Sequence, residues 1–319
     1  RPTKTIAENR MSSAVVFAYH NIGVRCLKAL LAQGVDVQLV VTHLDNPNEN
    51  IWFDSVATLA ASKGLRVVTP DDPNTPEFIA SIRALNPDLV FSFYYRHMLS
   101  KALLDIPTRG AFNMHGSLLP KYRGRVPINW AIICGETVTG ATLHRMVAKA
   151  DAGGIVGQEA VPILPHDIAV HVFDRVSMAA ERVLTEALPR LIAGTAIETP
   201  QDLSLGSYFG GRKPEDGRID WTQGAQSIHN LIRGVAPPYP GAFTDIRGLR
   251  LRVLRSRLGT RSAGATTNLH VEGERIVADC ADGRQLELPE LELAGKKIDA
   301  KSFTELFGAE RVEIVVGKL

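Results

Sequence analysis

The sequence is poor in features that mark several large classes of protein. It has only three cysteines in 319 residues, and no C-x-x-C pair or Cys/His cluster indicates a metal site. No run of about 18 apolar residues occurs, which argues against insertion in a membrane. The net charge is only +2, so no global basic field of the kind found in dedicated nucleic-acid binders is expected. What remains is the composition of an ordinary globular protein, with 45% hydrophobic and 22% charged residues.

The cysteines and the N-terminus also bear on location. Cys26 and Cys134 lie in apolar helical patterns, so we expect both to be small core residues. An odd, sparse cysteine count is typical of a reducing cytoplasm. Residues 1–10 are polar, lack the apolar core of a signal peptide and precede Met11. We interpret them as a tag or an upstream extension outside the fold, and we expect a cytoplasmic protein.

The first half of the chain alternates between strand-like and helix-like segments. Short apolar runs at 14–18, 35–42, 65–68 and 88–93 predict buried strands. Helical patterns occupy 22–33, 54–63 and 77–85, and the first two stop at a glycine. This order predicts an α/β fold with a doubly wound, mostly parallel sheet, of Rossmann-like form.

The turn after the first strand lacks the glycines of a dinucleotide-binding loop. Residues 19–23 read YHNIG, where that fingerprint would be G-x-G-x-x-G. A nicotinamide dehydrogenase is therefore not expected. Ligands of open α/β sheets lie beyond the carboxyl ends of the strands, which would place residues 94–99 near residues 113–125.

Residues 113–125 run from a strand into a loop that carries candidate catalytic groups. On a strand Asn113 and His115 point the same way, and an amide donor beside an imidazole can hold an oxyanion while a proton moves. A lone N-x-H is otherwise a polar strand end. Asp151, in the small-residue loop after a strand at 138–146, would by itself be a turn residue. His144, within that strand, is interpreted as structural.

A change in composition between residues 195 and 217 predicts a domain junction near 200–217. We expect a catalytic domain at 11–200 and a β-rich, OB-like, barrel-like domain at 201–319, with a leading helix at 224–235 and strands at 249–258, 268–280, 284–292 and 311–317. Six arginines occur within residues 247–261. Without interleaved aromatic residues, they favour a solvated sheet face over a nucleic-acid contact.

Three stretches together resemble the folate-dependent formyltransferase family: NMHGSLLP at 113–120, TGATLH at 139–144 and ADAG at 150–153. The family includes methionyl-tRNA, glycinamide ribonucleotide and sugar-nucleotide formyltransferases, and the likeness runs from residue 15 to about residue 241. Within it, the chain is most similar to the formyltransferase domain of the bifunctional polymyxin-resistance enzymes, which act on UDP-4-amino-4-deoxy-L-arabinose in lipid A modification. The shared stretches are VFAYH at 16–20, FSFYYRH at 91–97, HGSLLPKYRGR at 115–125 and LHRMV at 143–147.

The resemblance implies a reaction and a set of residues. A UDP-linked amino sugar would attack the formyl carbon of 10-formyltetrahydrofolate, with His115 transferring the proton, Asn113 stabilising the transition state and Asp151 adjusting the protonation of His115. The residues expected to contact folate are His97, Met98, Leu99, Arg125, Val147, Ala148, Lys149, Ala150 and Asp151. Arg212, Lys213, Asn230 and Arg233 are expected either on the nucleotide side of the acceptor site or as bridges between domains, since arginine suits phosphate contacts.

Two other functions remain as alternatives. Methionyl-tRNA formyltransferase has the same catalytic residues, but it would need an electropositive surface for tRNA. A catalytically idle binding module on the same fold is disfavoured by the joint presence of Asn113, His115 and Asp151. The enzymes that the chain resembles usually carry a second, NAD-dependent decarboxylase domain, so the sequence is expected to be either a stand-alone enzyme or a piece of such a protein. The sequence does not decide whether the protein forms a homo-oligomer.

Overall fold

The computed structural model describes residues 11–261 and 266–314, so the expected tag or extension at 1–10 lies outside the described residues. The chain divides into two compact units. The first consists of the chain up to Arg123 together with Gly140–Ala160 and Val176–Tyr208. The second consists of Gly124–Thr139, Val161–Arg175 and the chain from Phe209 onward. The chain therefore passes between the units several times, once within the expected junction at 200–217.

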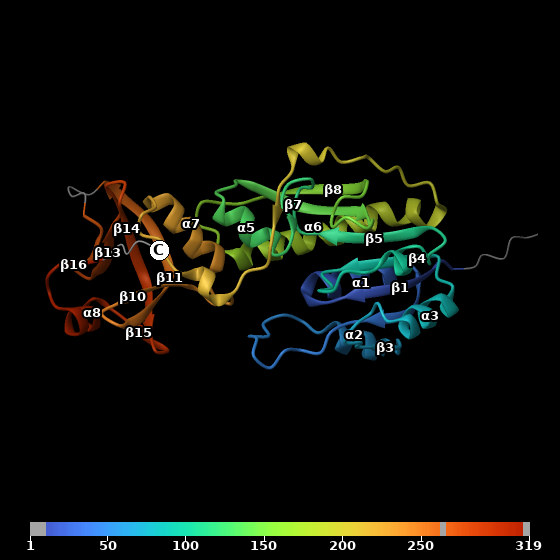
Figure 1. Cartoon of the computed structure of the whole chain (residues 1–319), viewed down its shortest axis with the longest axis horizontal. Helices are drawn as coiled ribbons and strands as arrows, with labels where there is room; N and C mark the ends of the chain where they lie inside the picture. The colour runs from blue at the N-terminus through green and yellow to red at the C-terminus, as the bar shows by residue number, and fades with distance from the viewer. Residues whose placement is uncertain (1–10, 262–265, 315–319) are drawn as a thin grey trace, which may run out of the picture. The chain divides into compact units, whose positions relative to one another are not determined.

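The first unit is built around a seven-stranded sheet in the order β3-β2-β1-β4-β5-β7-β8 (Figure 1). Strands β1 to β5 pair in parallel, and β7 runs antiparallel to β5. This confirms the expected doubly wound, mostly parallel sheet. The strands are β1 (Ser13–Ala18), β2 (Asp36–Val41), β3 (Val67–Val68), β4 (Leu89–Phe93), β5 (Gly110–His115), β7 (Val138–Arg145) and β8 (Ile155–Pro162).

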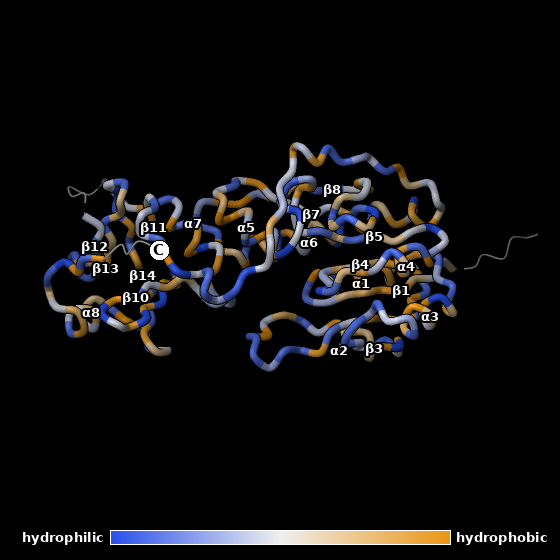
Figure 2. Tube along the Cα trace, viewed as in Figure 1, coloured by the Kyte–Doolittle hydropathy of each residue, from blue (hydrophilic) through white to orange (hydrophobic). Residues whose placement is uncertain are grey.

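The apolar runs of the sequence become the centre of this sheet. Every residue of β1 and β4 is buried, and Figure 2 shows hydrophobic residues among the strands and helices of this unit. Strands buried on both faces read as continuous apolar runs because helices cover the two sides of a parallel sheet. Those helices are α1 (His20–Ala32), α2 (Val56–Ser62), α3 (Pro76–Leu85), α4 (Lys101–Leu104) and α6 (Ala169–Ala193).

The second unit holds an antiparallel sheet in the order β10-β11-β14-β13-β12-β16, with β15 paired to β14, which curls into a half-barrel. Its core combines residues of α7 with inward residues of the strands, for example Ile228, Ile232, Leu251 and Leu286. The elements are β10 (Ala242–Ile246), β11 (Leu249–Arg261), β12 (Asn268–Glu272), β13 (Arg275–Asp279), β14 (Arg284–Leu293), β15 (Lys296–Ile298), β16 (Val312–Glu313), α5 (Pro127–Ile133), α7 (Ala225–Val235) and α8 (Ala300–Phe307).

Several expected details of the second half are wrong. The strand expected at 268–280 is a hairpin, because Gly273 has a φ of +62° and turns the chain between β12 and β13. The sequence analysis expected only strands after residue 249 and did not predict the helix α8. Asp299 caps this helix by accepting a hydrogen bond from the Ser302 N–H. The strand expected at 311–317 is described only as Val312–Glu313, and residues 315–317 lie outside the described part of the chain.

Cys134 is exposed, against expectation, whereas Cys26 is buried. The reason is the length of α5, which ends at Ile133 and leaves Cys134 at its C-cap beside Gly135. Seven helical residues do not extend the apolar face as far as Cys134.

Candidate active site

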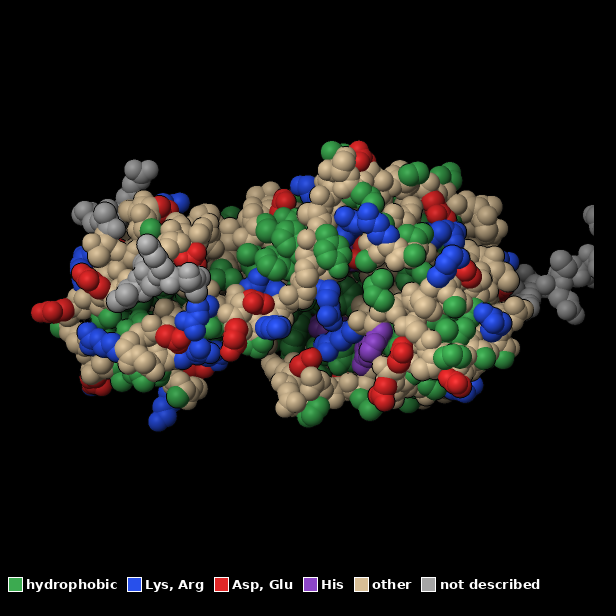
Figure 3. Space-filling model, in the orientation of Figure 1, with side chains coloured by type: hydrophobic (Ala, Val, Ile, Leu, Met, Phe, Trp, Pro, Cys, Tyr) green, Lys and Arg blue, Asp and Glu red, His purple; other side chains and the backbone are tan. Residues whose placement is uncertain are grey.

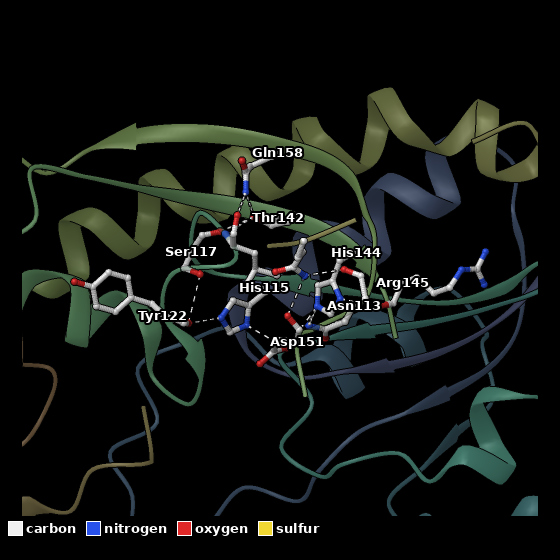
Figure 4. Close-up of polar contacts among 12 residues, drawn as sticks. Asn113, His115, Ser117, Tyr122, Thr142, His144, Arg145, Asp151 and Gln158 are labelled. Carbon is white, nitrogen blue, oxygen red and sulfur yellow. Dashed lines mark hydrogen bonds and ion pairs between the residues drawn. The ribbon is translucent and has the colours of Figure 1, made fainter. Parts of the chain in front are cut away.

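The end of β5 places the two candidate catalytic side chains on one face. Asn113 is half-buried and His115 is only 6% exposed, while Met114 between them packs into the core on the other face. In the antiparallel register of β5 with β7, Asn113 lies opposite His144 and His115 opposite Thr142. Figure 4 shows these side chains gathered at the strand ends.

Asp151 reaches His115 from the loop between β7 and β8. Its Oδ1 atom lies 3.5 Å from Nδ1 of His115. Asp151 has a φ of +51°, a left-handed conformation that aspartate tolerates better than most residues. The structure thus brings together the three residues that the sequence proposed as catalytic.

The loop that carries Asp151 is fixed at two points. A Cβ atom at Gly153 would lie 1.9 Å from the carbonyl oxygen of Arg145, so only glycine allows this close backbone approach. Gln201 donates from Nε2 to the carbonyl oxygens of Asp151 (3.0 Å) and Gly153 (2.7 Å). Nothing in the sequence pattern pointed to Gln201, which lies 50 positions from Asp151 in the chain.

The tautomer of neutral His115 follows from its hydrogen bond. Its Nε2 lies 2.7 Å from the carbonyl oxygen of Tyr122, and a carbonyl can only accept, so Nε2 carries the proton. The lone pair of the neutral ring is therefore on Nδ1, the nitrogen that faces Asp151. Nδ1 is the atom available to take a proton from a substrate.

The turn after β5 is tied down so that the Tyr122 carbonyl stays in place. Ser117 donates from Oγ to the Lys121 carbonyl oxygen at 2.7 Å. Thr142 donates to the Ser117 carbonyl oxygen at 2.6 Å and accepts from Nε2 of Gln158 at 2.8 Å. This network, drawn in Figure 4, links β7 and β8 to the loop that orients His115.

His144, interpreted from the sequence as structural, contacts both Asn113 and Asp151. Its Nδ1 lies 2.8 Å from the carbonyl oxygen of Arg145 and must donate, which leaves a lone pair on Nε2 of the neutral ring. Nε2 lies 3.2 Å from Nδ2 of Asn113 and 3.5 Å from Oδ1 of Asp151. The Asn113 amide is thereby oriented with one N–H toward His144, and its second N–H has no hydrogen-bond partner among the described residues.

The residues expected to contact folate lie in two segments of the first unit, apart from Arg125. His97, Met98 and Leu99 follow β4, with Met98 60% exposed and Leu99 buried. The loop after β7 carries the others: Val147 (40% exposed), Ala148, Lys149, Ala150 and Asp151. Arg125 belongs to the second unit, where its backbone N–H donates to the Phe209 carbonyl at 2.9 Å.

The residues expected at the nucleotide differ in their surroundings within the second unit. Arg212 and Lys213 line a pocket together with Asn129 and Tyr239. The Arg212 guanidinium lies 4.6 Å above the Trp130 ring and donates to the backbone carbonyl oxygen of Asp216 at 2.6 Å. Burial lowers the pKa of Arg212, and the charge of the nearby Asp216 opposes part of this shift. Arg212 forms no ion pair with a carboxylate among the described residues, so the pocket presents a partly desolvated cation with Asp216 nearby.

Asn230 and Arg233 are instead buried on α7 and bonded within the unit. Arg233 donates from Nε to Oδ1 of Asn230 (3.0 Å) and from a terminal nitrogen to the Leu164 carbonyl (3.2 Å). Asn230 also accepts from Gln226 at 3.1 Å.

The arginine-rich strand β11 lies beside acidic residues. Arg250 pairs with Asp245 at 3.1 Å and Arg252 with Glu292 at 2.5 Å. Figure 3 shows Lys/Arg and Asp/Glu side chains intermixed on the visible face of this unit. These pairs agree with a solvated sheet face; the Arg261 side chain lies outside the described residues.

Residues 11–261 and 266–314 contain no group of three or more His, Cys, Asp and Glu side chains arranged to hold a metal ion. No helix in the same part of the chain has the length and apolarity needed to cross a bilayer.

Family models cover most of the chain. The formyl transferase model matches residues 15–188, and the model of the formyl transferase C-terminal domain matches residues 212–307. The first match alone covers more than half of the 319 residues.

Solved structures of similar fold include sugar N-formyltransferases. An N-formyltransferase from Helicobacter canadensis, in complex with folinic acid and dTDP-3-aminofucose, has a TM-score of 0.69 at 21% identity, over 91% of this chain and 100% of that one. WlaRD, a sugar 3N-formyltransferase studied with dTDP and 5-N-formyl-THF, has a TM-score of 0.68 at 19% identity, over 90% and 99%. HypX from Aquifex aeolicus, in complex with tetrahydrofolic acid, has a TM-score of 0.60 at 17% identity, over 92% of this chain and 46% of that one. At these identities the likeness concerns the fold.

Proposed function

The chain belongs to the formyl transferase family, and we propose that it moves the formyl group of 10-formyltetrahydrofolate to the amine of a nucleotide-linked amino sugar. The observation that carries this proposal is the contact of Asp151 with His115 beside Asn113, in a chain that matches both formyl transferase models. Solved proteins of the same fold are crystallised with formyl folates and with dTDP or a dTDP-linked amino sugar, which supports the two substrate classes.

The reaction needs a proton acceptor and an oxyanion donor. The sugar nitrogen forms a bond to the formyl carbon, and the carbonyl oxygen becomes an oxyanion that accepts from the Asn113 N–H that does not face His144. His115 takes the proton of the attacking nitrogen on Nδ1, and the Asp151 carboxylate stabilises the imidazolium that results. When the bond to the folate nitrogen N10 breaks, that nitrogen receives the proton, and the products are the N-formyl sugar and tetrahydrofolate.

Folate binds, in this proposal, to the segment after β4 and to the loop after β7. Met98 and Val147 offer exposed apolar surface for a planar heterocycle, and Lys149 is an exposed cation on the same loop. Arg125 is proposed to contact the anionic part of the folate.

The acceptor is proposed to be UDP-4-amino-4-deoxy-L-arabinose, used in lipid A modification and polymyxin resistance, in the cytoplasm. The stretch HGSLLPKYRGR at 115–125 supports this choice. The phosphates are proposed to bind Arg212 and Lys213, because both line one pocket and Arg212 is a partly buried cation that forms no ion pair among the described residues. Asn230 and Arg233, whose polar groups are bonded within α7 and its neighbours, would support this unit without touching the nucleotide.

The proposal is tested by supplying 10-formyltetrahydrofolate with one amine at a time and following tetrahydrofolate release and the mass of the product. The amines are UDP-4-amino-4-deoxy-L-arabinose, UDP- and dTDP-linked amino sugars of other types, and methionyl-tRNA. Formylation of the UDP-arabinose derivative at the highest kcat/KM is expected. Turnover of dTDP sugars alone would contradict the proposed sugar, turnover of methionyl-tRNA alone would establish the tRNA enzyme, and no turnover at all would favour an idle binding module.

A further inference from the structure

The segment after β4, residues 96–100, has neither helical nor strand structure. It contains His97, Met98 and Leu99, which the proposed function assigns to folate. Irregular backbone holds a fixed shape only where its polar groups find partners. The partners of this segment therefore decide whether it offers a preformed surface.

His43, at the end of β2, holds the first residue of the segment. Its Nε2 accepts a hydrogen bond from the backbone N–H of Arg96 at 3.0 Å. The imidazole stacks on Tyr95, with ring centroids 4.1 Å apart and planes at 13°, and on His97 at 5.0 Å and 27°. Burial, together with the charges of His97 and Arg96, lowers the pKa of His43 to about 4, so the ring remains a neutral acceptor near pH 7.

Asn74, from the loop between β3 and α3, holds the other end. Its Oδ1 accepts from the backbone N–H of Ser100 at 2.7 Å, and its Nδ2 donates to the carbonyl oxygen of Met98 at 2.9 Å. One amide side chain thus replaces the two backbone partners that a sheet would supply.

A third contact involves the long loop after β2. Glu49 receives two hydrogen bonds from the Arg96 guanidinium, both 2.9 Å long, and the arginine lowers the pKa of this carboxyl. Both side chains are 39% exposed, so this ion pair is a weaker restraint than the hydrogen bonds of His43 and Asn74.

The contacts of His43 and Asn74 leave the middle of the segment available. Among the described residues, the backbone N–H and C=O groups of His97 and Leu99 have no hydrogen-bond partner. A heterocycle with alternating donors and acceptors along one edge can pair with such groups, provided that the backbone is held still.

We propose that His43 and Asn74 are positioning residues for the folate substrate: they hold residues 96–100 in the conformation that receives it. This inference rests on the proposed function, because folate is the ligand assigned to the segment. Neither side chain needs to touch the ligand, and both act through the backbone that they bind.

The test measures the binding of 5-formyltetrahydrofolate, which is not a formyl donor, alongside the kinetics with 10-formyltetrahydrofolate. His43→Phe keeps an aromatic ring but loses the acceptor, and His43→Gln restores an acceptor. Asn74→Ala loses both bonds, and Asn74→Asp keeps only the acceptor for Ser100. Gln33→Ala is the matched control, because it removes a side-chain bond of similar length to the Thr185 carbonyl, 2.9 Å, elsewhere in the same unit.

His43→Phe and Asn74→Ala are expected to raise the folate Kd and the folate KM about tenfold, equivalent to about 1.4 kcal/mol. The kcat and the KM of the amine should stay within about twofold of wild type, since only binding of folate is weakened. The folate Kd and KM of His43→Gln and Asn74→Asp should lie between those of wild type and of the variants that lose the bonds, and those of Gln33→Ala should match wild type. Amide hydrogen exchange at Arg96 and Ser100 should become faster in the variants that lose the acceptor for each N–H.

Two negative results have different meanings. If wild type binds 5-formyltetrahydrofolate and folded variants at both positions bind it equally well, the positioning role is wrong while the proposed function stands. If wild type does not bind it at all, the proposed function and this inference both fail.

Discussion

Two imidazole rings share one carboxylate oxygen in the catalytic cluster. Oδ1 of Asp151 lies 3.5 Å from Nδ1 of His115 and 3.5 Å from Nε2 of His144. Each ring uses its other nitrogen to donate to a backbone carbonyl, at Tyr122 and at Arg145. The backbone therefore decides which nitrogen of each histidine faces the reaction.

Replacing the two catalytic side chains separates proton transfer from oxyanion binding. His115→Ala should lower kcat about 10²–10⁴-fold through loss of the base, and Asn113→Ala about 10²–10³-fold through loss of the donor. Steady-state kinetics gives the effect, and circular dichroism shows whether each variant is folded. A folded His115→Ala enzyme with wild-type kcat would remove the residue from the mechanism.

His144 should influence kcat without forming part of either substrate site. His144→Phe keeps a ring of similar size but no longer accepts from Asn113, so the amide loses its fixed orientation. Loss of one such hydrogen bond should lower kcat about tenfold, with the KM of both substrates little changed. His144→Gln, whose Oε1 can accept from Asn113, should recover part of the rate; a raised KM at unchanged kcat would point to a different role.

At the scale of elements, the loop between β7 and β8 depends on one close backbone approach. Gly153→Ala would put a Cβ atom 1.9 Å from the Arg145 carbonyl oxygen, so the loop must move and take Asp151 away from His115. We expect a loss of about 1–3 kcal/mol in the free energy of unfolding and a lower kcat. Gly157→Ala is the control, because its Cβ would lie 3.1 Å from the Val183 side chain and at an ordinary contact distance, 3.9 Å, from the Val183 carbonyl oxygen. Equal effects of the two substitutions on kcat would contradict the claim that the close approach at Gly153 holds Asp151 beside His115.

The sequence predicts those elements whose signals are local. β1 and β4 were recognisable because they are buried on both faces, and α3 because Thr75 and Pro76 begin it. The helix α8 has a local capping residue, Asp299, but it is only eight residues long and lies between short strands. Its helical pattern was therefore too short to be recognised among the strand-like segments.

The contacts of His144, Gln201, His43 and Asn74 could not be predicted in this way. The pairing of His144 with Asn113 depends on the register between two strands about thirty residues apart, and nothing local to either strand sets that register. Gln201, His43 and Asn74 bind backbone groups 24 to 53 positions away, with no periodicity that relates them. Proximity of Asp151 to His115, by contrast, followed from the family resemblance.

For the whole molecule, stability should fall as the pH drops below about 6.5. Burial, as the main cause, lowers the pKa of His20 from 6.5 to about 3 and that of His43 to about 4. The Arg96 charge adds to both shifts, and the His97 charge adds to that of His43. Between pH 6.5 and these values the unfolded chain binds protons that the folded chain does not, so unfolding is favoured.

A fully buried histidine should lower the free energy of unfolding by about 1.4 kcal/mol per pH unit in this range. The effect should be smaller for His20 and His43, which are partly exposed. Carboxyls with lowered pKa values, Glu49 beside Arg96 and Glu272 beside His270, add to the loss below pH 4.5. Urea unfolding at about pH 7 and about pH 5 measures the slope, and His43→Phe should reduce it. A free energy of unfolding that is the same at both values would refute the prediction.

The hydrogen bonds from Gln201 to the Asp151 loop also determine where the chain can be cut. A fragment of residues 11–200 would contain Asn113, His115 and Asp151, and the whole of the sheet in the first unit, yet it would stop one residue short of Gln201. Such a fragment has a complete set of catalytic side chains, but the loop that carries Asp151 has lost the two hydrogen bonds from Gln201. A fragment for separate expression should therefore extend past α6 and include Gln201, although the residues after α6 carry no catalytic group.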